Sequence, residues 1–263
     1  MTLLTSVALA LGASLAMAAA WGVQRLTGRS GWIDTIWSAA VGLGGLAAVA
    51  LADGGDPGRR VAVGVVAAAW SVRLALHIGA RTRGSGEDPR YAALAAEWGP
   101  AFPLRLFLFL QVQAACAWVL ILAIALAAAD PAPFPRLLDG LAGLVALVAL
   151  IGEAMADAQL ARFRRDGASG GICEVGLWRW SRHPNYFFEW LGWCAWPLAA
   201  IDPMGGHPWG WAALAAPVLM YVLLVHASGI PPLEAHMAAT RGEAFRSLQR
   251  RVNAFFPGPR RAG

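Results

Sequence analysis

The chain has 263 residues, of which 58% are hydrophobic and only 14% are charged, and its mean hydropathy is +0.53. In a soluble domain about a quarter of the residues are charged, so this composition excludes a soluble protein and indicates a chain that crosses a membrane several times. The formal net charge is +5, and all 21 basic residues are arginine. Because the arginines gather between apolar runs, they indicate membrane topology and not nucleic-acid binding.

Apolar runs of transmembrane length follow one another along the chain. We expect seven transmembrane helices, near residues 2–23, 32–52, 60–80, 103–128, 136–163, 184–201 and 208–227. A long polar loop is expected up to Gly99, and a C-terminal cytoplasmic amphipathic helix is expected over 232–256, on the membrane face or over a cofactor. The predicted fold class is an all-α integral membrane protein. No repeat or low-complexity segment divides residues 1–263, which predicts a single transmembrane domain.

The arginines predict the orientation of these helices. With seven spans, one side of the membrane is flanked only by Arg59, Arg60 and Arg136, and the remaining arginines, apart from Arg73 inside the third span, lie on the other side. By the positive-inside rule we expect a cytoplasmic C-terminus and a periplasmic N-terminus. We expect the first run to stay as a transmembrane helix and not to be a cleaved signal peptide, because Arg25 and Arg29 follow it and no positive side chain precedes it. The arginine- and alanine-rich composition is typical of GC-rich coding, so we expect the inner membrane of a bacterium.

The stretch Gly176–Glu189 gathers polar side chains at the mouth of an apolar run. Pro184 disfavours helix at the residue before it and suits the first turn of a new helix, which is therefore expected to begin at about 184. In that helix Asn185 and Glu189 share one face. Polar groups at such a place cost free energy unless something binds them, which indicates a ligand site. The alternative is a membrane-interface anchor built from the arginines and tryptophans of this region.

Ionisable residues inside the expected spans are a second source of candidates. Asp34 lies at the start of the second span, and Glu153 and Asp157 share a face of the fifth. In the third span Arg73 and His77 share a face at the same spacing. The three cysteines have no metal-ligand spacing, so neither a zinc site nor a disulfide framework is expected.

Three stretches carry a resemblance to a known family. Gly176–Glu189 resembles the C-terminal motif of the steroid 5-alpha-reductase superfamily, particularly its bacterial branch, the DUF1295 family. Arg83–Tyr91 and Ser228–Glu234 fit the same branch, so the resemblance covers most of the chain. In its shorter form, Arg182–Tyr186 also resembles the sterol reductases and the isoprenylcysteine carboxyl methyltransferases.

The resemblance implies an NADPH-dependent reductase with the cofactor held by transmembrane helices and loops. It implies that Asn185, Glu189 and Asp157 contact NADPH, that Arg164 binds its phosphates and that Arg83 lies near its adenosine. The same motifs add further candidate cofactor contacts, namely Arg182, His183, Tyr186 and Glu234. A GxGxxG loop followed by a helix is absent, so no Rossmann unit is expected.

The residues expected to bind the substrate differ from those of the animal members of the family. The animal enzymes grip a 3-keto group with a Gln-Glu pair and a tyrosine, whereas the best counterpart of the pair here is Ile33-Asp34 and the third span has no tyrosine. Asp34 is the candidate proton donor, helped by His77 or Tyr91. The expected reaction is hydride transfer to the polarised C=C of a steroid-like or other lipophilic enone, with a proton donor on the carbonyl oxygen.

Two alternatives stay open at this point. Arg182–Tyr186 with Glu234 also suits an S-adenosylmethionine-dependent membrane methyltransferase that acts on a lipid or prenylated thiol. A lipid-binding membrane protein without catalysis is the third possibility. The partners expected are a lipophilic small molecule and the lipid bilayer, with no nucleic acid and no metal, and the chain is expected to be a monomer.

Overall fold

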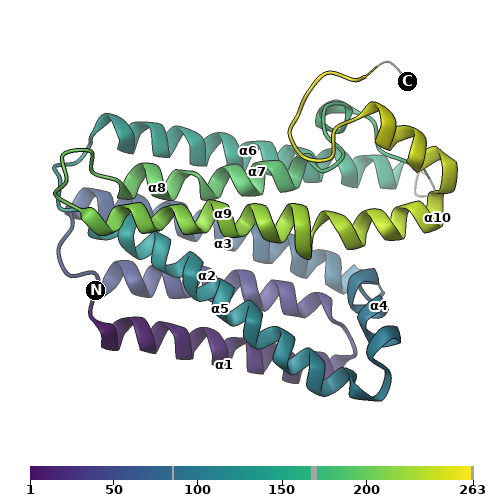
Figure 1. Ribbon diagram of the computed structural model, residues 1–263, viewed down its shortest axis with the longest axis horizontal. Helices are drawn as coiled ribbons and strands as arrows, with labels where there is room; N and C mark the ends of the chain where they lie inside the picture. Colours follow the sequence, from purple (N-terminus) through teal and green to yellow (C-terminus); the bar gives the residue numbers. More distant parts are fainter. Residues whose placement is uncertain (85, 167–170, 262–263) are drawn as a thin grey trace. The chain divides into compact units, whose positions relative to one another are not determined.

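The computed structural model describes residues 1–84, 86–166 and 171–261, and these residues form helices and connecting segments with no strand among them (Figure 1). The chain divides into two compact units, of which the first holds Met1–Ala142 and Trp196–Ala216. The second unit holds Gly143–Ala195 and Pro217–Gly263. Each unit is described by itself below. The single domain over 1–263 stays a prediction.

The helices follow the apolar runs of the sequence. In chain order they are α1 (Leu3–Thr27), α2 (Gly31–Ala50), α3 (Pro57–Gly84), α4 (Pro89–Trp98), α5 (Phe102–Ala129), α6 (Leu137–Arg165), α7 (Pro184–Trp193), α8 (Ala195–Ala200), α9 (Ala215–Tyr221) and α10 (Ile230–Arg251). Shorter turns are η1 (Gly99–Ala101), η2 (Gly176–Arg179), η3 (Pro208–Leu214) and the π-helical η4 (Val222–Ala227).

Among the described residues, six helical segments are long and apolar enough to cross a membrane. They are 3–27, 31–50, 57–84, 89–129, 137–165 and 208–251, which confirms a multi-pass membrane protein. The expected span 184–201 is divided into the shorter helices α7 and α8, which adjoin at Cys194. The count of seven spans therefore stays a prediction.

The segment that was expected to be a polar loop up to Gly99 contains helix α4, so that expectation is wrong. Asp88 caps this helix because its carboxylate accepts a hydrogen bond from the backbone N–H of Arg90 at 2.9 Å. Pro89 occupies the first turn, where its missing N–H costs nothing. These two local signals and several alanines favour a short helix. Ser85 lies outside the described residues.

In the first unit, α1, α2 and α5 lie side by side, and α3 packs on α2 (Figure 1). Glycines allow the close approach of α2 and α5, because a Cβ atom at Gly44 would lie 2.4 Å from Cδ1 of Ile121. The interior is filled by small and branched residues such as Val41, Leu110 and Ile124. Other large apolar side chains of these helices, including Leu76, are exposed, as expected where lipid is the solvent.

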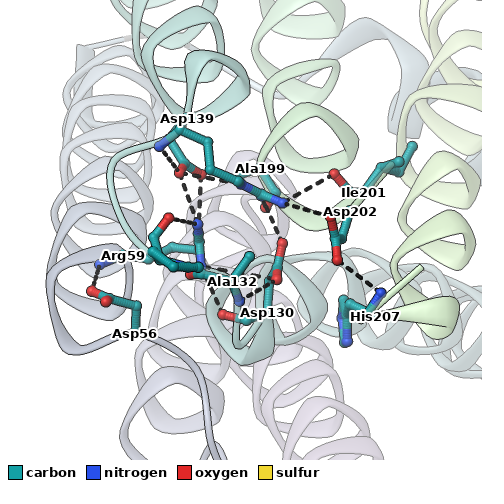
Figure 2. A network of polar contacts seen from close by, with 12 residues as sticks. Asp56, Arg59, Asp130, Ala132, Asp139, Ala199, Ile201, Asp202 and His207 are labelled. Atoms are coloured by element: carbon teal, nitrogen blue, oxygen red, sulfur yellow. Dashed lines mark hydrogen bonds and ion pairs between the residues drawn. The ribbon is translucent and has the colours of Figure 1, made fainter. Parts of the chain in front are cut away.

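A buried network of charges joins the connections at one end of the first unit (Figure 2). Arg59, whose side chain is 1% exposed, donates to both carboxylate oxygens of Asp139, at 3.0 and 2.8 Å. It also donates to the carbonyls of Asp130 and Ala132, at 2.7 Å each. Arg136 forms an ion pair with Asp130 at 2.6 Å. This network ties the first turn of α3 to the segment between α5 and α6 and to the first turn of α6.

In the second unit, α6 and α7 are in close contact. A Cβ atom at Gly152 would lie 2.4 Å from the ring of Phe188, so only glycine allows this approach. The chain before α7 is attached to α6 by the indole of Trp178, which donates to the carbonyl of Ala156 at 3.0 Å. The side chain of Gln159 accepts the backbone N–H of Leu177 at 2.9 Å. The motif that precedes α7 is thus held against α6.

Helix α10 occupies most of the range expected for the amphipathic helix, and it bends at Gly242, where φ is 55°. Its apolar residues Phe245 and Leu248 are buried together with Val252. Ile172, Met237 and Ala238 pack partly buried against them. At least this part of the apolar face is therefore used inside the protein. Contact of α10 with the membrane or with a cofactor stays a prediction.

Candidate functional site

Helix α7 begins at Pro184, as the sequence predicts, with His183 as the residue that precedes its first turn. The backbone of His183 (φ −137°, ψ 61°) lies outside the α-helical region, which a following proline disfavours. The ring of Tyr186 stacks on the ring of His183, with centroids 5.6 Å apart. Local residues thus contribute to the start of α7.

Arg182, His183 and Glu234 form one cluster. Arg182 donates from Nε and Nη2 to the two carboxylate oxygens of Glu234, at 2.7 and 3.0 Å. His183 Nε2 lies 2.8 Å from Oε1 of the same carboxylate, and Gln249 donates to Oε2 at 2.8 Å. The structure thus brings together three predicted site residues from motifs far apart in the sequence.

The electrostatics of this cluster follow from burial. Burial lowers the pKa of His183 below its ordinary value, and the hydrogen bond and charge of Glu234 offset only part of this effect. The imidazole is therefore neutral near neutral pH and donates its Nε2 proton to Glu234. Arg182 also donates to the carbonyls of Val252 and of Gln249, the latter at 3.3 Å. Much of its hydrogen-bonding capacity is used within the chain.

The contact face of α6 and α7 carries a second group of predicted residues. Asn185 Nδ2 donates to Oδ1 of Asp157 at 3.4 Å. One turn along each helix, Glu189 and Glu153 are buried, and Glu189 accepts the indole N–H of Trp193 at 2.8 Å. Asp157 is half-buried. Carboxylates and an amide on facing helices offer mostly hydrogen-bond acceptors, which suits a ligand rich in N–H and O–H groups.

Arg164 lies near the C-terminal end of α6 and is exposed. A guanidinium at that place is accessible to an anion such as a phosphate. Together with Asp157, Asn185, Tyr186 and Glu189, it belongs to the second unit. Arg83 is different, because it lies at the end of α3 in the first unit, with its guanidinium 5.8 Å from the centroid of the Trp32 ring.

The candidate catalytic residues lie in the first unit. Tyr91, which is 4% exposed, donates its hydroxyl proton to Oδ1 of Asp34 at 3.3 Å. Arg90 donates to Oδ2 of Asp34 and also to Asp88 at 2.9 Å. The amide of Gln113 donates to the Tyr91 oxygen at 3.4 Å. Asp34 and Tyr91 are thus brought together, and His77 lies half-buried on α3.

The charge of Arg90 is balanced by two carboxylates. Burial alone would raise the pKa of Asp88, but hydrogen bonds from Arg90 outweigh it and hold that pKa below its ordinary value. In this cluster both oxygens of Asp34 take part in hydrogen bonds, one with Arg90 and one with the Tyr91 hydroxyl. The role of Asp34 as proton donor stays a prediction.

The sequence analysis did not select several residues of these clusters. Gln113 carries an amide inside an apolar span, which is a signal of function or of a satisfied interior pair. Arg90 lies within the recognised stretch Arg83–Tyr91, but its partner Asp34 comes from another helix. Ser181, fully buried, carries no signal that distinguishes it from other serines.

Comparison with known proteins places the chain in a family. No curated protein and no solved structure matches it. The family described as "Protein of unknown function (DUF1295)" matches residues 20–252, which is most of the chain and includes every candidate site residue. The chain therefore belongs to the DUF1295 family.

Proposed function

We propose that the protein is an NADPH-dependent membrane reductase that saturates the polarised C=C bond of a steroid-like or other lipophilic enone. The observation that carries the proposal is the contact of Asn185 with Asp157. These residues come from two separate motifs that the resemblance to the steroid 5-alpha-reductases assigns to the cofactor. A membrane anchor offers no reason for an amide and a carboxylate to meet between two apolar helices.

The residues of the second unit fit the chemistry of NADPH. Asn185, Asp157 and Glu189 would hold the amide and hydroxyl groups, and Arg164 would pair with phosphate. When bound, NADPH supplies a hydride from its nicotinamide ring. Arg182, His183 and Glu234 are occupied with one another, so we assign them the task of fixing the start of α7 beside the cofactor.

In the first unit, Tyr91 is proposed to bind the carbonyl oxygen of the substrate. Its O–H proton passes to that oxygen, and the electron pair of the O–H bond stays on the phenol oxygen. The amide of Gln113 already donates to this oxygen and would stabilise the phenolate. Asp34, held by Arg90, orients the hydroxyl before the transfer. Hydride addition at the β-carbon together with this proton gives an enol. The enol then ketonises: its α-carbon takes a proton from solvent, and the enol proton returns to the phenolate.

A methyltransferase that uses S-adenosylmethionine is the second candidate. The observation in its favour is the joining of Arg182, His183 and Glu234, which are the residues that the resemblance to the isoprenylcysteine enzymes shares. The same cluster is consistent with a reductase, and the contact of Asn185 with Asp157 favours the reductase. We further propose that the protein acts as a monomer in the bacterial inner membrane.

The test is ligand-induced thermal stabilisation of the detergent-purified protein. NADPH should raise the unfolding midpoint, since a ligand at a hundredfold its Kd adds about 2.7 kcal/mol of stability. S-adenosylmethionine should not. Asn185→Ala and Glu189→Ala should each weaken NADPH binding by roughly tenfold or more, because a hydrogen bond to a buried or charged partner contributes about 1.5–3 kcal/mol.

The matched control is Gln111→Ala, which removes an amide from α5 that bonds Ser14 and lies outside the proposed site. Its NADPH affinity should equal that of the natural chain. Stabilisation by S-adenosylmethionine alone would support the methyltransferase. If neither ligand stabilises the protein, the remaining possibility is a lipid-binding membrane protein without catalysis.

A further inference from the structure

The segment Val252–Gly258, here called the strap, follows α10 and runs along the residues that precede α7. The backbone N–H of Arg182 donates to the carbonyl of Asn253 at 2.9 Å. The N–H of Gly258 donates to the carbonyl of Trp180, also at 2.9 Å. The strap is thus attached to the recognised motif through backbone groups at both of its ends.

Ser181 links the strap to His183, the residue before α7. Its side chain is 0% exposed, and its hydroxyl lies 2.9 Å from the carbonyl oxygen of Phe255 and 3.2 Å from that of Ala254. The same oxygen accepts the backbone N–H of His183 at 3.1 Å. A hydroxyl has one proton, which the two carbonyls share, and lone pairs that accept the N–H, so all these contacts are compatible. One side chain therefore couples the strap to the residue that precedes α7.

Phe255 anchors the strap on α7 and α9. Its ring is 4% exposed and meets Phe187, Trp190 and Tyr221 edge to face, with centroids 5.9, 5.8 and 5.6 Å apart. Aromatic pairs at these distances and angles are favourable beyond the area that they bury. The strap therefore packs against the side of α7 that carries Phe187 and Trp190.

That side is opposite to the proposed ligand site. An α-helix turns by about 100° per residue, so Asn185 and Glu189 lie within about 40° of each other. Phe187 and Trp190 lie roughly 140–200° away from Asn185 around the same helix. Asn185 contacts Asp157 of α6, whereas Phe187 and Trp190 contact Phe255. Helix α7 is thus held between α6 on its polar face and the strap on its aromatic face.

We infer that the strap is a positioning element of the ligand site and that Ser181 is the positioning residue that couples them. Neither would touch the ligand. They hold the start of α7 in place and set how the helix is turned, and so where Asn185 and Glu189 point. The identity of the ligand rests on the proposed function, but the placement of α7 against α6 does not.

The first measurement follows the position of α7 without any ligand. In a background without Cys116, Cys173 and Cys194, the rate at which Asp157→Cys and Asn185→Cys form a disulfide under mild oxidation reports how closely α7 approaches α6, because a disulfide forms only when the Cβ atoms come within about 3.5–4.5 Å. Ser181→Ala should slow this reaction, and Phe255→Ala should do the same. Ser228→Ala is the matched control, since its exposed hydroxyl bonds only the carbonyl of Leu223 in its own turn. It should leave the rate unchanged.

The second measurement is NADPH affinity in the chain with its natural cysteines, followed by nicotinamide fluorescence. Ser181→Ala should weaken binding by about tenfold, the loss expected when one hydrogen-bonded contact is misplaced. Size-exclusion chromatography and circular dichroism identify the variants that fold. If Phe255→Ala does not fold, the milder substitution Phe255→Leu replaces it. Unchanged disulfide rates in both the Ser181 and Phe255 variants would overturn the inference. Slower disulfide formation with no NADPH binding by the natural chain would support the strap's role and overturn the proposed cofactor.

Discussion

The imidazole of His183 lies 2.8 Å from the carboxylate of Glu234, although 51 residues separate them in the sequence. His183 is the residue before α7, and Glu234 lies in the first turns of α10. The contact therefore fixes the start of one helix to the start of another. Because burial lowers the pKa of His183, the contact is between a neutral imidazole and a carboxylate.

This pairing predicts a pH dependence of stability. The unfolded chain protonates His183 near its ordinary pKa of 6.5, whereas the folded chain resists protonation. As the pH falls below about 6.5, the unfolded state binds more protons, so the stability contribution of the neutral imidazole is lost. His183→Gln keeps a donor for Glu234 and does not titrate. The unfolding midpoint of this variant should fall less steeply than that of the natural chain below that pH, and equal slopes would contradict the assignment.

The buried ion pairs of Figure 2 predict how the loss of one partner changes the stability of the protein. The guanidinium of Arg59 is paired with two carboxylates, those of Asp130 and Asp139. Asp139→Asn removes one of these negative charges and leaves the guanidinium buried. Breaking such a pair costs about 3–5 kcal/mol, whereas replacing both partners with apolar residues is often neutral. We expect a large fall in the unfolding midpoint for Asp139→Asn and a recovery in Arg59→Met/Asp139→Leu. Asp53→Asn, at an exposed carboxylate, is the control and should change stability by less than about 0.5 kcal/mol.

Local signals in the sequence predicted part of this structure. The start of α7 at Pro184 follows from the restricted backbone of proline, and the apolar runs gave the membrane helices because only a helix satisfies its backbone in lipid. The capping signal of Asp88 was also present, but a polar composition concealed helix α4.

The partners of the charged residues could not be predicted in the same way. Nothing near Arg182 in the sequence indicates Glu234, and nothing near Asp34 indicates Arg90, because each pair is made by packing of distant helices. The sequence analysis grouped Glu234 with Arg182–Tyr186 and named Tyr91 as a helper of Asp34, but it indicated neither Gln249 nor Arg90 as a partner. The role of Ser181 depends on three backbone atoms from two segments, which no local pattern records.

The Tyr91 cluster predicts how turnover depends on its members. Tyr91→Phe removes the transferable proton and should lower turnover on a 3-keto-4-ene steroid, or on whichever enone is the substrate, by at least about 10²-fold. Asp34→Asn should lower turnover to a similar extent while NADPH binding survives. A loss of stability without a selective loss of turnover in Asp34→Asn would mean that Asp34 serves only to hold Arg90. Full activity of a stable Tyr91→Phe variant would redirect the search for the donor to His77.

The last prediction concerns the segment 184–200, on which the number of spans depends. Helices α7 and α8 are each short, but at about 1.5 Å per residue the 17 residues from Pro184 to Ala200 reach roughly 25 Å, close to the roughly 30 Å of a bilayer core. If this segment crosses, there are seven spans and the two termini lie on opposite sides of the membrane. If it does not, there are six and the termini share a side.

Arg25 and Arg29, which follow α1, and the arginines of α10 with Arg260 and Arg261 favour a cytoplasmic C-terminus and a periplasmic N-terminus. A reporter fused after the last residue should therefore be active in the cytoplasm, and one fused before Met1 should be active in the periplasm. A third reporter inserted at Gly205, between α8 and η3, should be periplasmic, because α7 and α8 have then crossed from the cytoplasmic motif. Termini on one side, with the Gly205 reporter in the cytoplasm, would show that α7 and α8 re-enter without crossing and that the chain spans the membrane six times.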